Sequence, residues 1–102
     1  MICRGRVAVV TGAGRGLGRA HVLAFAAAGA SVVVNDIGVE NDGSGGSAGP
    51  AHDVVAEIRA AGGEAIANGS DIADWTQAGA LVRAAIDAFG RLDVVVNNAG
   101  FV

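Results

Sequence analysis

Short, valine-rich apolar runs alternate with longer amphipathic, alanine-rich runs along the chain. These short apolar runs predict strands at 7–11, 31–35, 64–68 and 92–97, and the continuous valines of the second run are typical of a strand buried on both faces. The alanine-rich runs have helical spacing, and they predict helices at about 16–28, 50–61 and 75–89. Strands that alternate with helices in this way are typical of a parallel sheet with helical crossovers.

Capping residues stand at the predicted ends of the helices. Gly29 follows the first helix and Gly62 the second, while Asp74 precedes the third helix and Gly90 follows it. The segment 38–49 is rich in Gly, Ser, Asn and Asp, which predicts a mobile loop between the second strand and the second helix.

The spacing of apolar residues predicts which helix faces pack on the sheet. In the first helix we expect this face to comprise Leu17, Ala20, Leu23, Ala24 and Ala27. In the second helix we expect it to comprise Val54, Val55, Ile58 and Ala61. We also expect Trp75 to be a packing residue near the start of the third helix. His21 and His52 each stand alone, which favours surface or packing roles over metal binding.

Right-handed crossovers and a glycine-rich turn after the first strand favour one topology. It is a Rossmann-type, doubly wound α/β sheet of about four strands in the order 3-2-1-4, with three helices. Two helices would cover one face and one helix the other, which leaves apolar surface exposed. The fourth strand would have an open edge formed by Leu92, Val94, Val95 and Val96. We therefore expect an incomplete sheet, and an isolated chain that is poorly soluble or partly molten.

Composition limits the classes of protein to which the chain can belong. Its 102 residues, 52% of them hydrophobic, suit one small domain. No run approaches the roughly 20 apolar residues of a membrane span, and residues 1–6 lead into a strand rather than a signal-peptide core. We therefore expect a cytoplasmic protein without a membrane partner. The net charge of −3 argues against nucleic acid as a partner, and one cysteine with two histidines offers no metal site.

The segment from Thr11 to Gly18, T-G-A-G-R-G-L-G, is the most informative motif of the chain. Gly12 permits a sharp exit from the first strand, Gly16 lets the backbone approach a pyrophosphate, and Gly18 allows close packing of helix on strand. Free amides at the helix start, with the positive end of the helix dipole, would bind the anion. Arg15 would reach a phosphate or remain a solvated loop residue. The alternative is a glycine-rich turn that only packs the helix.

Asp36 follows the second strand, 18 residues after Gly18. A carboxylate at this position can accept hydrogen bonds from both ribose hydroxyls of an adenosine. A 2′-phosphate about 4 Å away would be repelled by on the order of 4 kcal/mol at an effective dielectric of about 20, which favours NAD over NADP. Arg15 would instead favour NADP, by pairing with that phosphate. The alternative for Asp36 is a turn-forming residue at a strand end.

The glycine motif and the later Asn97-Asn98-Ala99-Gly100 together resemble the short-chain dehydrogenase/reductase family, whose pattern is T-G-x-x-x-G-x-G followed by N-N-A-G. The resemblance covers the whole chain, but only the first part of a family domain of about 250 residues. It implies a cofactor site made of Gly12, Arg15, Gly16, Leu17, Gly18, Asp36, Asp71, Ile72, Asn98, Ala99 and Gly100. Asp71 and Ile72 would hold the adenine, and residues 98–100 would line the cofactor beside its ribose. Asn97 would steady the central strands.

The family's chemistry implies residues that this sequence lacks. In the family, a tyrosine hydroxyl exchanges a proton with the substrate oxygen, and a lysine four residues later lowers the pKa of that tyrosine. The sequence contains neither tyrosine nor lysine. We therefore name no catalytic residue and expect residues 1–102 to be the N-terminal part of a single NAD-binding domain whose catalytic part is absent. A full-length form would act on a small-molecule substrate and, by resemblance, form a homo-oligomer.

Several segments resemble one branch of the family, the (3R)-hydroxyacyl-CoA dehydrogenase domains. They are 32–36, the glycine-rich loop that follows, 54–58, 62–63 and 67–68. This resemblance implies a 3-hydroxyacyl-CoA substrate. A second class of function remains open, namely a non-catalytic nucleotide-binding or interaction module whose sheet is completed by a partner chain.

Overall fold

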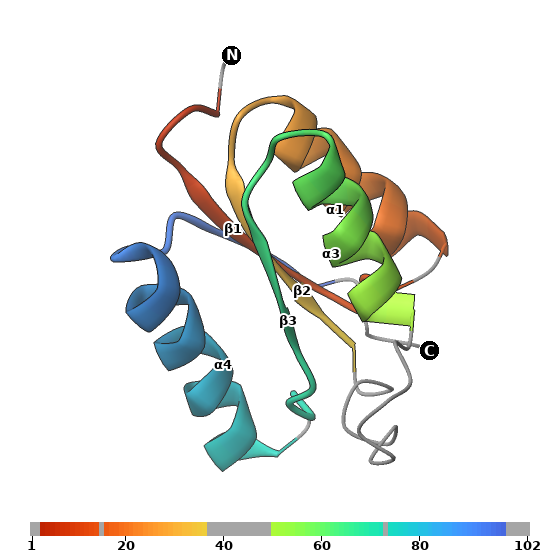
Figure 1. Ribbon diagram of the computed structural model, residues 1–102. Coiled ribbons are helices and arrows are strands. Elements are labelled where there is room, and N and C mark those ends of the chain that lie inside the picture. Colours follow the sequence, from red (N-terminus) through yellow and green to blue (C-terminus); the bar gives the residue numbers. More distant parts are fainter. Residues whose placement is uncertain (1–2, 15, 37–49, 73, 98–102) are drawn as a thin grey trace.

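The computed structural model describes residues 3–14, 16–36, 50–72 and 74–97 (Figure 1). Its strands form one parallel sheet in the order β3-β2-β1-β4, with the bounds β1 (Val7–Thr11), β2 (Ser31–Asn35), β3 (Ala65–Asn68) and β4 (Val94–Val96). In the middle of the sheet Val9 pairs with Val33 on one side and with Val95 on the other. The predicted fold class and strand order are confirmed, although β3 begins one residue later than predicted and β4 is shorter at both ends.

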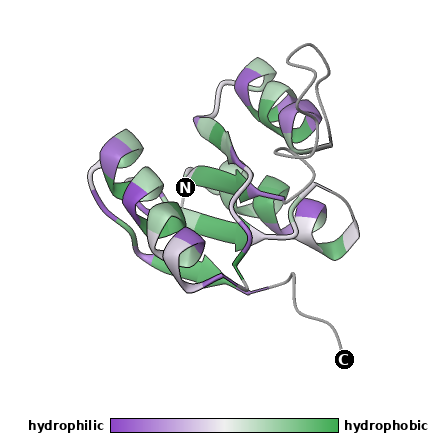
Figure 2. Cartoon of the chain, turned by 90° about the horizontal axis from the view of Figure 1, so that it is seen from below, coloured by the Kyte–Doolittle hydropathy of each residue, from purple (hydrophilic) through white to green (hydrophobic). Residues whose placement is uncertain are grey.

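Helices cover both faces of this sheet, with the bounds α1 (Gly16–Ala27), α3 (Pro50–Ala60) and α4 (Trp75–Phe89). Helices α1 and α3 lie together on one face and α4 lies on the other, as predicted (Figure 1). On the first face Val22 and Val54 belong to the same buried cluster as Val10. On the second face Leu81 packs with Val9 and Val33. The strands are almost entirely hydrophobic, whereas the helices show both hydrophobic and hydrophilic residues (Figure 2).

The buried side of α1 differs from the predicted one. Its buried residues are Gly18 and Val22, and Phe25 is partly buried. By contrast Leu17 is 71% exposed, and Ala20, Ala24 and Ala27 are also exposed. Leu23 of the predicted face is partly buried against this cluster, but the rest of the prediction was wrong. Ala20, Ala24 and Ala27 have helical spacing, yet they lie on the solvent side, because alanine is small enough to occupy either side of a helix. Gly18 and Val22 are one turn apart, which places them on the same side of the helix.

The packing of α3 follows its sequence pattern, but that of α4 departs from it at one residue. Val54, Val55 and Ile58 are buried as predicted, while Ala61 lies beyond the end of α3 and is exposed. Trp75 is 92% exposed, so the prediction that it packs in the core was wrong. Trp75 is the first residue of α4, and the buried residues of this helix, Leu81 and Ala85, lie further along it.

Both predicted caps of α4 are present. The Asp74 side chain accepts a hydrogen bond from the Gln77 N–H at 3.1 Å, which satisfies one of the free donors of the first turn. Gly90 has φ 82°, and its N–H donates to the Ile86 carbonyl at 2.7 Å. None of the helices in the described ranges is long and apolar enough to cross a lipid bilayer.

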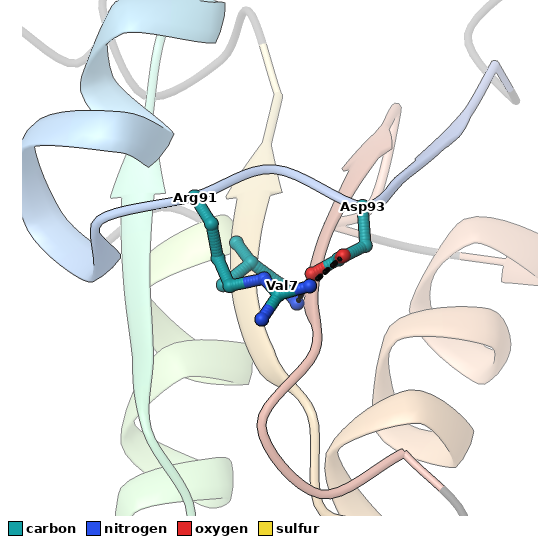
Figure 3. A network of polar contacts seen from close by, with 3 residues as sticks. All are labelled: Val7, Arg91 and Asp93. Carbon is teal, nitrogen blue, oxygen red and sulfur yellow. Dashed lines mark hydrogen bonds and ion pairs between the residues drawn. The ribbon is translucent and has the colours of Figure 1, made fainter.

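A polar network holds the beginning of β4 against β1 (Figure 3). The Asp93 N–H donates to the Val7 carbonyl at 2.9 Å, and Asp93 Oδ2 accepts from the Val7 N–H at 2.8 Å. Arg91 donates to Asp93 Oδ1 at 2.6 Å. The hydrogen bond from Arg91, then that from the Val7 N–H, and the positive charges of Arg91 and Arg6 lower the pKa of Asp93. The same contact raises the pKa of Arg91. This network fixes the strand that leads into Asn97.

Candidate functional site

Polar residues stand at the carboxyl ends of all four described strands. Thr11, Asn35 and Asn68 are the last residues of β1, β2 and β3, and Asn97 directly follows β4. All four strands are parallel, so these residues lie at one edge of the sheet. At this edge the chain order reverses, because β1 has β2 on one side and β4 on the other. Ligands of doubly wound folds bind at such a reversal.

The glycine-rich turn after β1 has the backbone geometry that the sequence predicts. Gly12 and Gly16 have φ 61° and 60°, in the left-handed region that favours glycine. The Ala13 N–H donates to the Asn35 carbonyl at 2.8 Å, which ties the turn to the end of β2. A Cβ at Gly16 would meet no atom within 4 Å, so the backbone at the start of α1 borders open space.

The start of α1 suits an anion on electrostatic grounds. Its first turn contains no acidic residue, so the unpaired N–H groups and the positive end of the helix dipole are not neutralised by the helix itself. Leu17 follows Gly16 and is 71% exposed at this end. Gly18 is buried, in agreement with its predicted role in close packing.

Asp36 is held beside the glycine turn. Its Oδ2 accepts a hydrogen bond from the Gly14 N–H at 3.1 Å, and its own N–H donates to the Asn68 carbonyl at 3.0 Å. Its side chain is part-buried. The structure therefore brings together the two motifs on which the sequence analysis depends, the glycine-rich turn and the acidic residue after β2.

Asp71 and Ile72 come after β3, the strand that pairs with β2, and Asp36 directly follows β2. The Asp71 N–H donates to Gln77 Oε1 at 2.8 Å, and the Asp71 carbonyl accepts from the Asp74 N–H at 3.0 Å. Ile72 is partly buried against the cluster on the α4 face. The first turn of α4 thus positions both residues at the same edge of the sheet as the glycine turn.

Two polar side chains of this edge were not predicted as site residues. Thr11 is 2% exposed, and its Oγ1 lies 3.3 Å from the Val96 carbonyl and 3.4 Å from Asn97 Oδ1, so it can donate its proton to either. This contact agrees with the expectation that Asn97 steadies the central strands. Asn35 is also 2% exposed and donates to the segment after β3. The signal in the sequence was a polar residue that directly follows a run of three or more apolar strand residues.

Four predicted site residues, Arg15, Asn98, Ala99 and Gly100, lie outside the described residues. Within the described ranges, no group of three or more His, Cys, Asp and Glu residues could hold a metal ion. A cavity of about 580 Å³ lies between the carboxyl ends of α1 and α3, where Leu23, Ile58 and Gly63 line it. It is also lined by Ser31, the first residue of β2, so it lies at the opposite edge of the sheet from the glycine turn.

Comparisons with known proteins agree with this arrangement. The family model described as short chain dehydrogenase matches residues 6–102. The peroxisomal multifunctional enzyme type 2 of Mus musculus is 57% identical over 99 residues, a match that covers 96% of this chain and 13% of that protein. A crystal structure of a short chain dehydrogenase from Mycobacterium avium has a TM-score of 0.91 and 59% identity, covering 100% of this chain and 36% of that one.

A second solved structure is a 7α-hydroxysteroid dehydrogenase in complex with NADH and 7-oxo glycochenodeoxycholic acid. Its TM-score is 0.85 at 41% identity, and the match covers 97% of this chain and 35% of that one. The chain therefore spans well under two thirds of the length of these relatives.

Proposed function

Since the chain belongs to the short chain dehydrogenase family, we propose that it is the nicotinamide-cofactor-binding part of an oxidoreductase. Such an enzyme would transfer hydride between the cofactor and a hydroxy or keto substrate. One observation carries the proposal, the hydrogen bond from the Gly14 N–H to Asp36 Oδ2. It joins the turn that would hold a pyrophosphate to the carboxylate that would hold a ribose, and this supports a site that binds both parts of a dinucleotide.

The described residues fit a nicotinamide dinucleotide. The open space over Gly16 and the uncompensated start of α1 would accept the pyrophosphate at Gly12, Gly16 and Gly18. Asp36 would accept from the ribose hydroxyls, Asp71 and Ile72 would hold the adenine, and the exposed Leu17 would pack on the cofactor. Once bound, the nicotinamide would accept or donate the hydride. Roles for Arg15, Asn98, Ala99 and Gly100 stay predictions from the family pattern.

NAD is the proposed form of the cofactor. The Asp36 carboxylate, fixed by the Gly14 N–H, would face the 2′ position, where a phosphate would meet a like charge. At about 4 Å and an effective dielectric of about 20, the repulsion is on the order of 4 kcal/mol, which corresponds to roughly a thousandfold in affinity. Arg15 would reduce this preference if it paired with the phosphate.

We propose that the substrate class is a 3-hydroxyacyl-CoA, as the likeness of segments 32–36 and 54–58 to that branch of the family suggests. Support comes from the 57% identity to the mouse peroxisomal multifunctional enzyme type 2. The tyrosine and lysine of the family's chemistry would lie in a part of the protein beyond these residues, since the sequence contains neither. A homo-oligomeric full-length form and a cytoplasmic location stay predictions.

The proposed binding site can be tested by mapping NAD onto an isotope-labelled chain by NMR. Backbone N–H signals of Gly14, Gly16 and Asp36 should shift with saturating NAD, because these groups border the proposed pyrophosphate and ribose. The N–H of Gly63 should not shift, because it lines the cavity at the opposite edge of the sheet. Gly16→Val should abolish the shifts by filling the space over the helix start. Shifts confined to the Gly63 side would overturn the proposed site.

The alternative function, a module completed by a partner chain, is favoured by the exposed edge of the sheet. Val95 of β4 is 56% exposed, and Ile86 of α4, on the same side of the fold, is 48% exposed. A partner strand added at β4 would bury this edge. Protection of the Val94–Val96 amides from hydrogen exchange in a stable heteromeric complex, combined with no response to NAD, would favour this alternative.

A further inference from the structure

Asn35 is a buried amide at the end of a strand whose three preceding residues are valines. It is 2% exposed and follows three valines of β2 that are fully buried. Its Nδ2 lies 3.0 Å from the Ser70 carbonyl oxygen, 3.2 Å from Asn68 Oδ1 and 3.3 Å from the Asn68 carbonyl oxygen. Asn68 Oδ1 also accepts from the Ser70 N–H at 2.8 Å. The two asparagine side chains therefore bind the segment that leaves the sheet after β3.

An amide at this position is explained by the segment it binds. A buried carboxamide is unfavourable unless its hydrogen bonds are made, and an apolar residue would suit a strand buried on both faces. The partners of Asn35 Nδ2 all belong to residues 68–70, which extend past the last rung of the ladder, where Asn35 pairs with Asn68. The Asn35 carboxamide thus extends the hydrogen bonding between the two strands beyond their last backbone pair. It holds residues 68–70, which leave the sheet at this point.

The same residue is connected to the other parts of the proposed site. Its carbonyl accepts from the Ala13 N–H of the glycine turn, and its neighbour Asp36 accepts from the Gly14 N–H. The far end of the loop is fixed by α4, since the Asp71 N–H donates to Gln77 Oε1. Asn35 is therefore the residue through which the pyrophosphate turn, the ribose carboxylate and the loop before Asp71 are joined.

We propose that Asn35 is a positioning residue for recognition of the base. By holding residues 68–70 it places the Asp71 carboxylate to accept a hydrogen bond from the exocyclic amino group of adenine. Asn35 itself does not touch the nucleotide. The inference rests on the proposed function, because it concerns how one part of the dinucleotide is selected.

The test compares the dissociation constants of NAD and of nicotinamide hypoxanthine dinucleotide, in which an oxo group replaces the amino group of the base. The unmodified chain should prefer NAD by about tenfold or more, the usual worth of a hydrogen bond to a charged group. In Asn35→Asp, which keeps the shape but loses the N–H donors, this preference should fall to within about twofold of unity. Asn68→Ala, which removes the acceptor shared by Asn35 and Ser70, should have the same effect and serves if Asn35→Asp does not fold.

Val54→Ala is the matched control, because it removes buried volume under α3 without touching the loop. It should lower the stability of the fold and leave the preference for NAD unchanged, which separates positioning from a general loss of structure. A folded Asn35→Asp or Asn68→Ala with the original preference would overturn the inference. So would an unmodified chain that binds both dinucleotides equally. An unmodified chain that binds neither would instead overturn the proposed function.

Discussion

Asp93 and Val7 exchange two hydrogen bonds although 86 residues separate them in the sequence. The main chain of Asp93 donates to Val7, and the side chain of Asp93 accepts from Val7. The first contact continues the pairing of β4 with β1, and the second places a carboxylate at the amino end of β1. Arg91 binds the other carboxylate oxygen, so Asp93 joins two strands and one charged side chain at the beginning of the β1–β4 pair.

This arrangement predicts an acid-sensitive contribution to stability. The pKa of Asp93 is lowered in the folded chain, chiefly by the Arg91 hydrogen bond and then by the Val7 N–H. Its contribution is therefore fully present above the unfolded pKa of about 3.9 and is lost as the pH falls through the lower folded pKa. Asp93→Asn should be less stable than the unmodified chain at pH about 7, and the difference should shrink below pH about 4. Urea unfolding at several pH values measures this.

Asp87→Asn is the control for that experiment, because Asp87 is an exposed carboxylate on α4. It removes one carboxylate without touching Val7 or Arg91, so it should not show a loss of stability at pH about 7 that shrinks below pH about 4. If Asp93→Asn and Asp87→Asn followed the same pH dependence, the network at the start of β4 would have no role in acid stability.

We expect substitution by alanine to have opposite effects on stability at Gly63 and at Gly79. A Cβ at Gly63 would lie 2.8 Å from Ile58 Cγ2 and 3.3 Å from the Ile58 carbonyl oxygen, and Ile58 is buried and cannot move aside freely. Gly63→Ala should therefore destabilise the chain by about 1–3 kcal/mol. Gly79 lies within α4 and faces open space, so Gly79→Ala should stabilise it by up to about 1 kcal/mol. Urea denaturation of the two variants gives the comparison, and a stabilising Gly63→Ala would contradict the packing of Gly63 on Ile58.

Trp75 is the only tryptophan of the chain and is 92% exposed, which gives a spectroscopic prediction. Its fluorescence should be that of a solvated indole in the folded state, with no shift of the emission maximum to longer wavelength on unfolding. Trp75→Gln should change the free energy of unfolding by no more than about 0.5 kcal/mol. A native emission maximum at clearly shorter wavelength than that of the unfolded chain would show that Trp75 is buried.

We expect Asp36→Ala to weaken the preference for NAD over NADP. Removal of the carboxylate abolishes both its hydrogen bonds to the ribose and its repulsion of a 2′-phosphate, so the preference for NAD over NADP should fall by at least about tenfold. Asp53→Ala is the matched control, because it removes the same charge from an exposed position on α3. Titration of both variants with both dinucleotides measures the effect, and an unchanged ratio in Asp36→Ala would reject the role of Asp36.

The sheet was predictable from the sequence because its signals are local and strong. Runs such as Val32–Val34 are continuous and β-branched, and the glycine turn after β1 favours the strand order that the structure shows. The buried side of α1 was not predictable from the same kind of pattern. Alanine is small enough to lie on any side of a helix, so the isolated Val22 carried the useful signal and the alanines concealed it.

The site was predictable only in part, for a different reason. The glycine turn and Asp36 are recognised from spacing along the chain, and their hydrogen bond places them together. The role of Asn35 depends on the register of β2 against β3, which sets Asn35 beside Asn68. That register comes from packing of the whole sheet, so a network across two strands cannot be read from either strand alone.

The most direct test of the proposed function is a calorimetric titration of the unmodified chain with NAD and, separately, with NADP. We predict saturable binding of NAD with a dissociation constant at least about tenfold smaller than that of NADP, because Asp36 is fixed beside the glycine turn. Binding of neither dinucleotide would contradict the proposed function, and tighter binding of NADP would contradict the proposed preference for NAD.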